Sequence, residues 1–191
     1  MESRLFQALK AFKGADGCEA NLFEEFKKIA EAAFFSGYFL INGGCKDAYK
    51  LKLTCIEFYY HEDDGNIKDE KKYLKGKDEF GYALGAVCPN PSGVDVLFDD
   101  PQKKYHASFL IRGYKAIEPG KKEWENNEKR KDWAPHDFWY DLFGGANMLS
   151  NGKFSIEWID ESDETLGYAE PMQRIKINDN RLWGFKRVEK L

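Results

Sequence analysis

The sequence predicts a single α+β domain, in which a curved, mostly antiparallel sheet packs against a few helices. Two patterns indicate this class. Apolar residues recur with helical spacing near the N-terminus, and short apolar runs separated by turn-forming residues follow along most of the remaining chain. With 191 residues, 42% of them hydrophobic, the chain has the size and composition of one ordinary domain, assigned to residues 1–191.

Two helices are predicted before the first strand. The first lies within residues 1–17 and carries an apolar stripe at helical spacing. The second starts after Asn21, which with Glu24 resembles a capping box, and ends near Gly37. Its expected buried stripe consists of Phe23, Phe26, Ile29, Ala30 and Ala33. A third helix is expected over residues 137–149.

The strands are predicted from short apolar runs bounded by turn signals. A hairpin turn at 99–102 joins two of them, and charged or acidic stretches at 61–77, 119–134 and 160–171 are expected to be loops or surface insertions. The expected strands are 38–41, 51–60, 82–87, 94–98, 105–117, 154–159, 174–177 and 183–188.

Charge and cysteine content narrow the function classes. The net charge of −4 does not favour a nucleic-acid binder, since phosphate contacts need clustered Lys and Arg. Residues 120–131 and 181–190 are locally basic, either as solvated surface or as a binding face. The four cysteines form no CxxC pair or zinc pattern. Without a signal peptide pattern or an apolar stretch of about 18 residues, we expect a cytoplasmic protein without membrane contact.

Glu57 and Arg112 are the main candidates for chemistry. Each is a charged residue inside a strand of otherwise buried type. A buried charge is costly unless it is paired, so the two could form a structural ion pair or simply face outward. The functional alternative is an acid, positioned by an arginine at the mouth of an aromatic pocket, that activates a water.

The residues after Glu57 extend this candidate site. Tyr59 shares a strand face with Glu57 and could stack on a flat ligand such as a base. His61 opens an acidic cluster that ends at Asp64, but consecutive residues rarely converge on one ion, so no metal is expected. No phosphate-binding loop or nucleophile motif is present, and no cofactor is expected.

The order of these segments resembles the alkyladenine (3-methyladenine) DNA glycosylase family of mammals and bacteria. The stretch LTCIEFYYHEDD is similar to the family's catalytic strand, and HASFLIRGYKAIEP is similar to a strand that carries an arginine and ends in Glu-Pro. Further similar stretches are FKKIAEAAFFSGYFLING, GVDVLF, DFWYDLFGGANMLSNGKFSIEWID and PMQRIKINDNRLWGFKRV. Together these stretches cover most of the chain in collinear order.

The resemblance implies a DNA repair enzyme that removes alkylated or deaminated purines from double-stranded DNA after flipping the nucleotide. It implies that Glu57 activates the hydrolytic water, that Arg112 helps to hold this water and that Tyr59 stacks against the flipped base. Asp95 stands where the family has a pocket Asn, and His61 is the candidate to replace the family's pocket His. No metal or organic cofactor is implied.

Two alternatives remain open. The same fold could be a non-catalytic module that binds a nucleic acid, a nucleoside or a protein. It could also be a hydrolase of small free nucleosides that keeps Glu57 and its pocket. The last alternative would account for the acidic net charge and for residues 66–93, which lack a counterpart of the tyrosine that family members insert into DNA.

Overall fold

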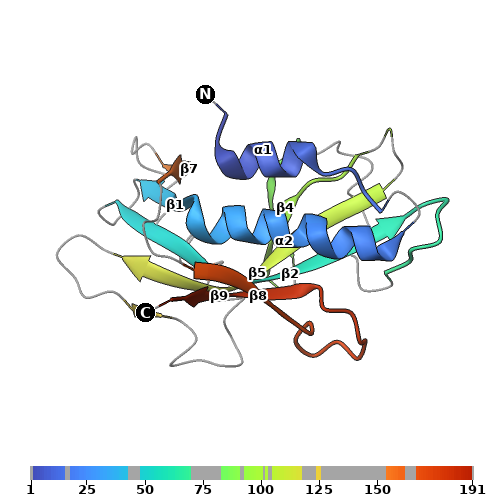
Figure 1. Cartoon of the computed structure of the whole chain (residues 1–191). Coiled ribbons are helices and arrows are strands. Elements are labelled where there is room, and N and C mark those ends of the chain that lie inside the picture. The colour runs from blue at the N-terminus through green and yellow to red at the C-terminus, as the bar shows by residue number, and fades with distance from the viewer. Residues whose placement is uncertain are drawn as a thin grey trace.

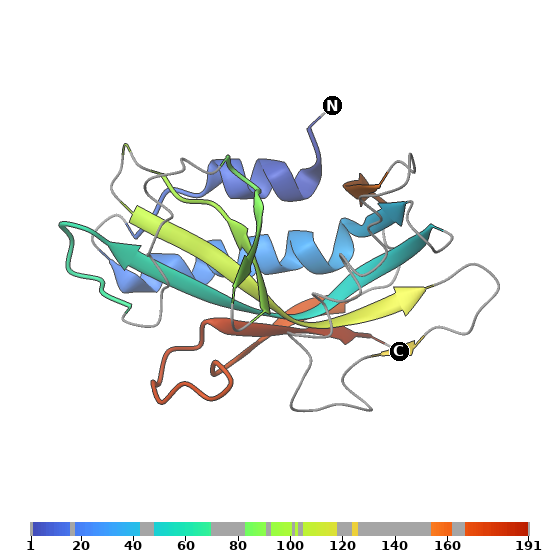
Figure 2. The ribbon, with the colours of Figure 1, turned by 180° about the vertical axis from the view of Figure 1, so that it is seen from behind.

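Two helices lie on one side of a broad sheet (Figures 1 and 2). They are α1 (Arg4–Ala11) and α2 (Glu19–Phe35). The computed structural model describes residues 2–15, 18–42, 48–69, 83–90, 93–100, 102, 105–117, 124–125, 154–161 and 167–190. Ser3 caps α1, because its side chain accepts a hydrogen bond from the Phe6 amide.

The sheet is built around two long strands, β2 and β5, that pair with each other along their length. The main strand order is β3-β4-β5-β2-β1-β7; β6 also pairs with β5, and β9 pairs with both β2 and β8. Every pairing between described strands is antiparallel. The strands are β1 (Gly37–Asn42), β2 (Tyr49–Glu62), β3 (Val87–Asn90), β4 (Gly93–Leu97), β5 (Tyr105–Ile117), β6 (Trp124–Glu125), β7 (Ser155–Asp160), β8 (Gly167–Met172) and β9 (Gly184–Glu189).

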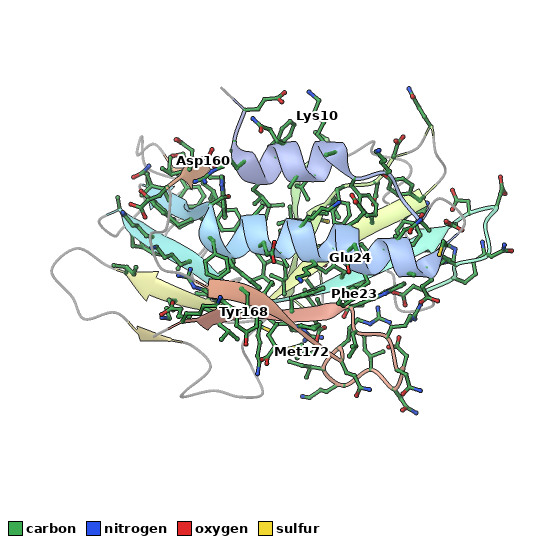
Figure 3. All side chains as sticks on the ribbon, viewed as in Figure 1. Lys10, Phe23, Glu24, Asp160, Tyr168 and Met172 are labelled. Carbon is green, nitrogen blue, oxygen red and sulfur yellow. The ribbon has the colours of Figure 1, made fainter. Side chains whose placement is uncertain are left out.

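The hydrophobic core lies between the helices and the sheet and is rich in aromatic rings. The Phe26 ring of α2 stacks on Phe58 of β2, with centroids 4.4 Å apart. Phe23 lies beside the strands below α2 (Figure 3), and its ring centroid is 5.8 Å from that of Phe185. The helices and the sheet therefore share one core, which confirms the α+β class and the antiparallel sheet.

Several predicted boundaries are wrong. Helix α2 begins at Glu19 after Cys18, so Asn21 lies inside the helix, where its side chain reaches the Ala15 carbonyl. The helix also buries Leu22 more deeply than Phe23. Local capping signals did not fix this start, because packing of the apolar face against the sheet determines where the helix begins.

The C-terminal strands also differ from the prediction. A strand occupies residues 167–172, where an acidic loop was expected, and residues 174–177 lie in a loop, where a strand was expected. Strand β3 starts at Val87, after a turn, instead of ending there. The expected helix at 137–149 lies outside the described residues, as does most of the insertion at 119–134.

Candidate functional site

Strand β2 presents aromatic side chains to the helices and a carboxylate to the other face of the sheet. Because successive strand residues point to opposite faces, the packing of Phe58 on Phe26 directs Glu57 and Tyr59 away from α1 and α2. Glu57 is nevertheless 0% exposed. The alternative in which Glu57 simply faces solvent is therefore wrong.

Two β-bulges shape the ladder beside Glu57. β2 and β5 keep one register on either side of a short irregular stretch. Within that stretch, Thr54 on β2 and Arg112 on β5 each stand opposite no partner residue. A bulge bends its strand and re-aims the side chain of the extra residue. Here the Arg112 side chain is directed across the ladder to Glu57.

Three donors hold the Glu57 carboxylate. Its Oε2 accepts hydrogen bonds from Arg112 Nε at 2.7 Å and from the Tyr59 hydroxyl at 3.0 Å. Its Oε1 accepts a hydrogen bond from the backbone amide of Ile175, which is distant in sequence. The structure thus brings together Glu57, Arg112 and Tyr59, as the sequence predicts. An ion pair and neutral donors together compensate the buried charge.

The protonation states of the neighbours suit these bonds. Burial lowers the pKa of Arg112, but the charge of Glu57 and the interactions with the Glu57 and Tyr59 side chains together outweigh this effect, and the pKa lies above its ordinary value. Burial and, secondly, the charge of Glu57 raise the pKa of Tyr59, so its hydroxyl stays protonated and can donate. Burial raises the pKa of the Cys55 thiol, two residues before Glu57, to about 12. Cys55 is therefore an inert thiol rather than a nucleophile.

A second charged cluster, which the sequence did not reveal, lies beside this group. The β8–β9 loop (residues 173–183) projects below the sheet, on the side away from the helices, and leaves β8 after Met172 (Figures 1 and 3). Its Arg174 side chain is 0% exposed and donates to Asp69 Oδ2 at 2.5 Å and Oδ1 at 3.4 Å. Asp179 in the same loop accepts hydrogen bonds from both Arg174 and Arg181.

Aromatic rings border this cluster. The Arg174 guanidinium lies 4.9 Å from the ring centroid of Tyr59 and 5.2 Å from that of Trp183. The Arg181 guanidinium lies 4.2 Å from the Trp183 ring. Cations favour the faces of aromatic rings, most strongly where water is excluded. Tyr59 therefore touches both charged groups, with its hydroxyl on Glu57 and its ring against Arg174.

Asp95 and His61 lie on the same face of the sheet as Glu57. Asp95 on β4 pairs with Leu110, which in turn pairs with Glu57 across β5, and Asp95 is only 5% exposed. His61 is partly buried and lies two residues beyond Tyr59. The Nδ1 of His61 accepts a hydrogen bond from the Asp69 amide at 3.3 Å. His61 is therefore hydrogen-bonded to the backbone of Asp69, the residue that pairs with Arg174.

The missed residues carry only weak sequence signals. Asp69 and Arg174 are 105 residues apart, and Asp69 sits in a polar stretch that resembles any surface loop. The apolar residues near Arg174 resemble a strand, so a strand was predicted where the structure has a loop. Gly113, which follows Arg112, could have indicated the bulge, because a glycine inside a strand often lies at a β-bulge.

The described residues show neither a metal-binding cluster nor a membrane-spanning helix. In that part of the chain, no three His, Cys, Asp or Glu side chains are arranged to hold a metal ion. Neither of the described helices is long and apolar enough to cross a membrane.

Comparison with known proteins gives no assignment. No protein-family model matches the chain, and no curated protein or solved structure is significantly similar to it. The relation to alkyladenine DNA glycosylases therefore stays a prediction based on the order of its sequence motifs.

Proposed function

We propose that the protein hydrolyses the N-glycosidic bond of a purine nucleotide, with Glu57 as the catalytic carboxylate. The observation that carries the proposal is the convergence of Arg112 and Tyr59 on a carboxylate that is 0% exposed. A charged residue at such a position in the sheet is costly unless it is paired, and charged groups held by specific partners are found at functional sites as well as in structural ion pairs.

The three hydrogen bonds leave one lone-pair position of the carboxylate without a donor among the described residues. A carboxylate offers about four lone-pair positions. Arg112 and Tyr59 use the two on Oε2, and Ile175 uses one on Oε1. The remaining position on Oε1 is where a water would be oriented. Arg112 and Tyr59 fix the carboxylate, and such a fixed orientation favours proton abstraction from one bound molecule.

The proposed reaction needs no covalent enzyme intermediate. The C1′–N bond of the flipped nucleotide breaks, and its electron pair stays on the purine nitrogen, which takes a proton from solvent. Positive charge develops on the sugar, and the Glu57 carboxylate stabilises it. Glu57 takes one proton from the water as the water oxygen bonds to C1′. Asp95 and His61 are proposed to contact the base, and alkylated or deaminated purines in double-stranded DNA are the proposed substrates.

The test is release of a damaged base from duplex DNA. Oligonucleotides that contain hypoxanthine or ethenoadenine are incubated with the protein, and abasic sites are measured. We expect cleavage by the parent and a loss of at least about a hundredfold in Glu57→Gln, because the amide cannot accept the proton. Glu170→Gln, at a partly exposed position on β8, is the control and should keep full activity. Absence of base release by the parent would refute the proposal for these substrates.

A second candidate function is a non-catalytic binding module on the same sheet face. It is favoured by the complete burial of Glu57 together with its three donors, since a structural ion pair has the same features. In that case the protein would retain DNA or a nucleoside without cleaving it, and Glu57→Gln would alter stability alone. Release of base from free inosine, but not from duplex DNA, would instead indicate a small-nucleoside hydrolase.

A further inference from the structure

The Arg174 side chain joins three parts of the chain at one buried point. It donates to Asp69, which follows β2, and to Asp179 within the β8–β9 loop. It also donates to the Phe58 carbonyl of β2 at 3.2 Å. These bonds engage both terminal nitrogens of a guanidinium that is 0% exposed, while its buried Nε makes no hydrogen bond to the described residues. Removing any one of these bonds would leave a buried charge partly uncompensated.

The neighbour of Arg174 makes the bond that matters for the carboxylate. Arg174 bonds to the backbone of Phe58, and the next residue, Ile175, donates its amide to Glu57, the residue before Phe58. Two consecutive residues of the loop are thus docked on two consecutive residues of β2. The other end of the loop is tied to the same place, because the Phe58 amide donates to the Trp183 carbonyl at 2.7 Å.

The backbone at this docking point is held in an unfavourable conformation. Lys176, directly after Ile175, has a φ of 60°, a left-handed conformation that costs free energy in a residue with a Cβ. Such a conformation persists only where surrounding contacts over-determine it. The bonds of Arg174 and Ile175 to β2 are contacts of this kind.

We propose that the Asp69–Arg174 ion pair is a positioning element of the site, which holds the β8–β9 loop so that the Ile175 amide fixes the orientation of Glu57. This inference rests on the proposed function and adds residues to it. Neither Asp69 nor Arg174 touches the substrate in this role. They act on Glu57 through the backbone of Ile175. The carboxylate then keeps one orientation, and the remaining lone pair of Oε1 points in one direction.

The test compares two conservative substitutions, Arg174→Lys and Arg187→Lys. The two arginines are matched: Arg187 is also buried, donates to the Phe34 carbonyl at 2.6 Å, pairs with Glu189 and lies 4.7 Å from the Phe35 ring centroid. Lysine keeps the charge but loses the planar fork, so both variants weaken one buried arginine site. The hydrogen bond of Arg187 to the Phe34 carbonyl anchors it at the end of α2, and its ion pair with Glu189 lies on β9.

The first measurement is hydrogen exchange of the Ile175 amide by NMR, referenced to the core amides of β5. In Arg174→Lys we expect Ile175 to exchange at least about tenfold faster relative to this reference, because the loop opens locally without global unfolding. In Arg187→Lys the ratio should stay at the parent value. Equal ratios in the two variants would overturn the proposal, whatever the activity of the protein.

The second measurement is steady-state hydrolysis of the damaged DNA. In Arg174→Lys we expect kcat to fall by about ten- to a hundredfold while KM changes by less than about twofold, because misplacement of a catalytic group affects the reaction step. A rise in KM with kcat unchanged would also overturn the positioning role. If the parent has no activity, the proposed function fails, and the exchange result still decides whether the ion pair holds Ile175 in place.

Asp69→Asn provides the same comparison if Arg174→Lys does not fold. It keeps the size of the Asp69 side chain and removes its charge from the pair with Arg174. Asp69→Asn should accelerate exchange of the Ile175 amide relative to the β5 amides, also by about tenfold or more. Unchanged exchange in this folded variant would contradict the proposal just as directly.

Discussion

Glu57 and Phe58 lie on opposite faces of β2 and are equally buried, but they are held by different forces. On the helix side, Phe58 is 0% exposed and its ring neighbours four other phenylalanines, at centroid distances from 4.4 to 6.2 Å. On the other side, Glu57 is also 0% exposed but has Arg112, Tyr59 and the Ile175 amide as partners. Consecutive residues of one strand thus belong to an apolar core and to a polar network.

The two faces differ in how the structure responds when one side chain is removed. Apolar contacts are shared among many neighbours, so loss of one side chain leaves a cavity whose cost depends on how far the core relaxes. The polar network depends on specific partners, so loss of one leaves a buried charge uncompensated. The polar face therefore specifies one arrangement, whereas the apolar face supplies most of the stability.

The largest effect is expected on the apolar face. Phe58→Ala should lower the free energy of unfolding by about 3–5 kcal/mol, the usual range for truncating a buried aromatic ring. Urea unfolding followed by circular dichroism measures it. A loss below about 1 kcal/mol would show that the aromatic cluster is loosely packed and that the two faces differ less than the structure indicates.

Removal of the arginine from the polar face should have a somewhat smaller effect. Arg112→Met should lower the free energy of unfolding by about 3 kcal/mol, since Glu57 then stays buried without its cation. The double variant Arg112→Met with Glu57→Gln should be more stable than the single variant, by about 1 kcal/mol or more, because the uncompensated charge is gone. If the double variant is less stable than Arg112→Met, the pair is not coupled as described.

Alkaline pH tests the burial of the Cys55 thiol on β2. The pKa of Cys55 is about 12 in the folded protein against 9.0 for an ordinary thiol, so the unfolded chain releases this proton first. The stabilisation is complete below pH 9 and is lost as the pH rises from 9 to 12, at up to about 1.4 kcal/mol per pH unit. Cys55→Ala should reduce this slope in urea unfolding between pH 9 and 10.5. An equal slope in parent and variant would contradict the burial of the thiol.

The smallest effect is expected for an ion pair that has good geometry but is open to water. Lys186 Nζ lies 2.6 Å from Glu170 Oε2, and the two side chains are 54% and 38% exposed to water. Glu170→Gln should leave the urea midpoint indistinguishable from the parent, because solvent screens such pairs. A shift as large as that of Arg112→Met would mean that burial does not distinguish the two kinds of ion pair.

Much of the fold could be predicted from local patterns. The strand at 105–117 has the predicted bounds, because its apolar run is long and is bordered by turn and charge signals. β8 was missed, since Glu170 and Pro171 make that stretch resemble a loop. Pro171 is tolerated in this strand because β8 pairs with only one neighbour, β9, among the described strands.

The candidate site could be predicted only in part. Glu57 and Arg112 were recognisable because a charge inside an apolar run requires a partner. That they meet depends on the register of β2 and β5 and on a bulge, neither of which the local pattern encodes. Asp69 and Arg174 were not recognised, because Asp69 lies in a polar stretch and Arg174 in one that resembles a strand. Their contact arises from the path of the β8–β9 loop.

β9 is synthesised long after β2, the strand with which it pairs, and this order has a consequence for the growing chain. β9 pairs with Cys55, Ile56 and Glu57, and the Ile175 amide that bonds to Glu57 lies 118 residues further along the chain. While the nascent chain grows, this edge of β2 has no partner from β9, and an open edge can pair with other chains. Slow translation ahead of residue 175 would therefore lengthen the period in which the central strand is prone to aggregation.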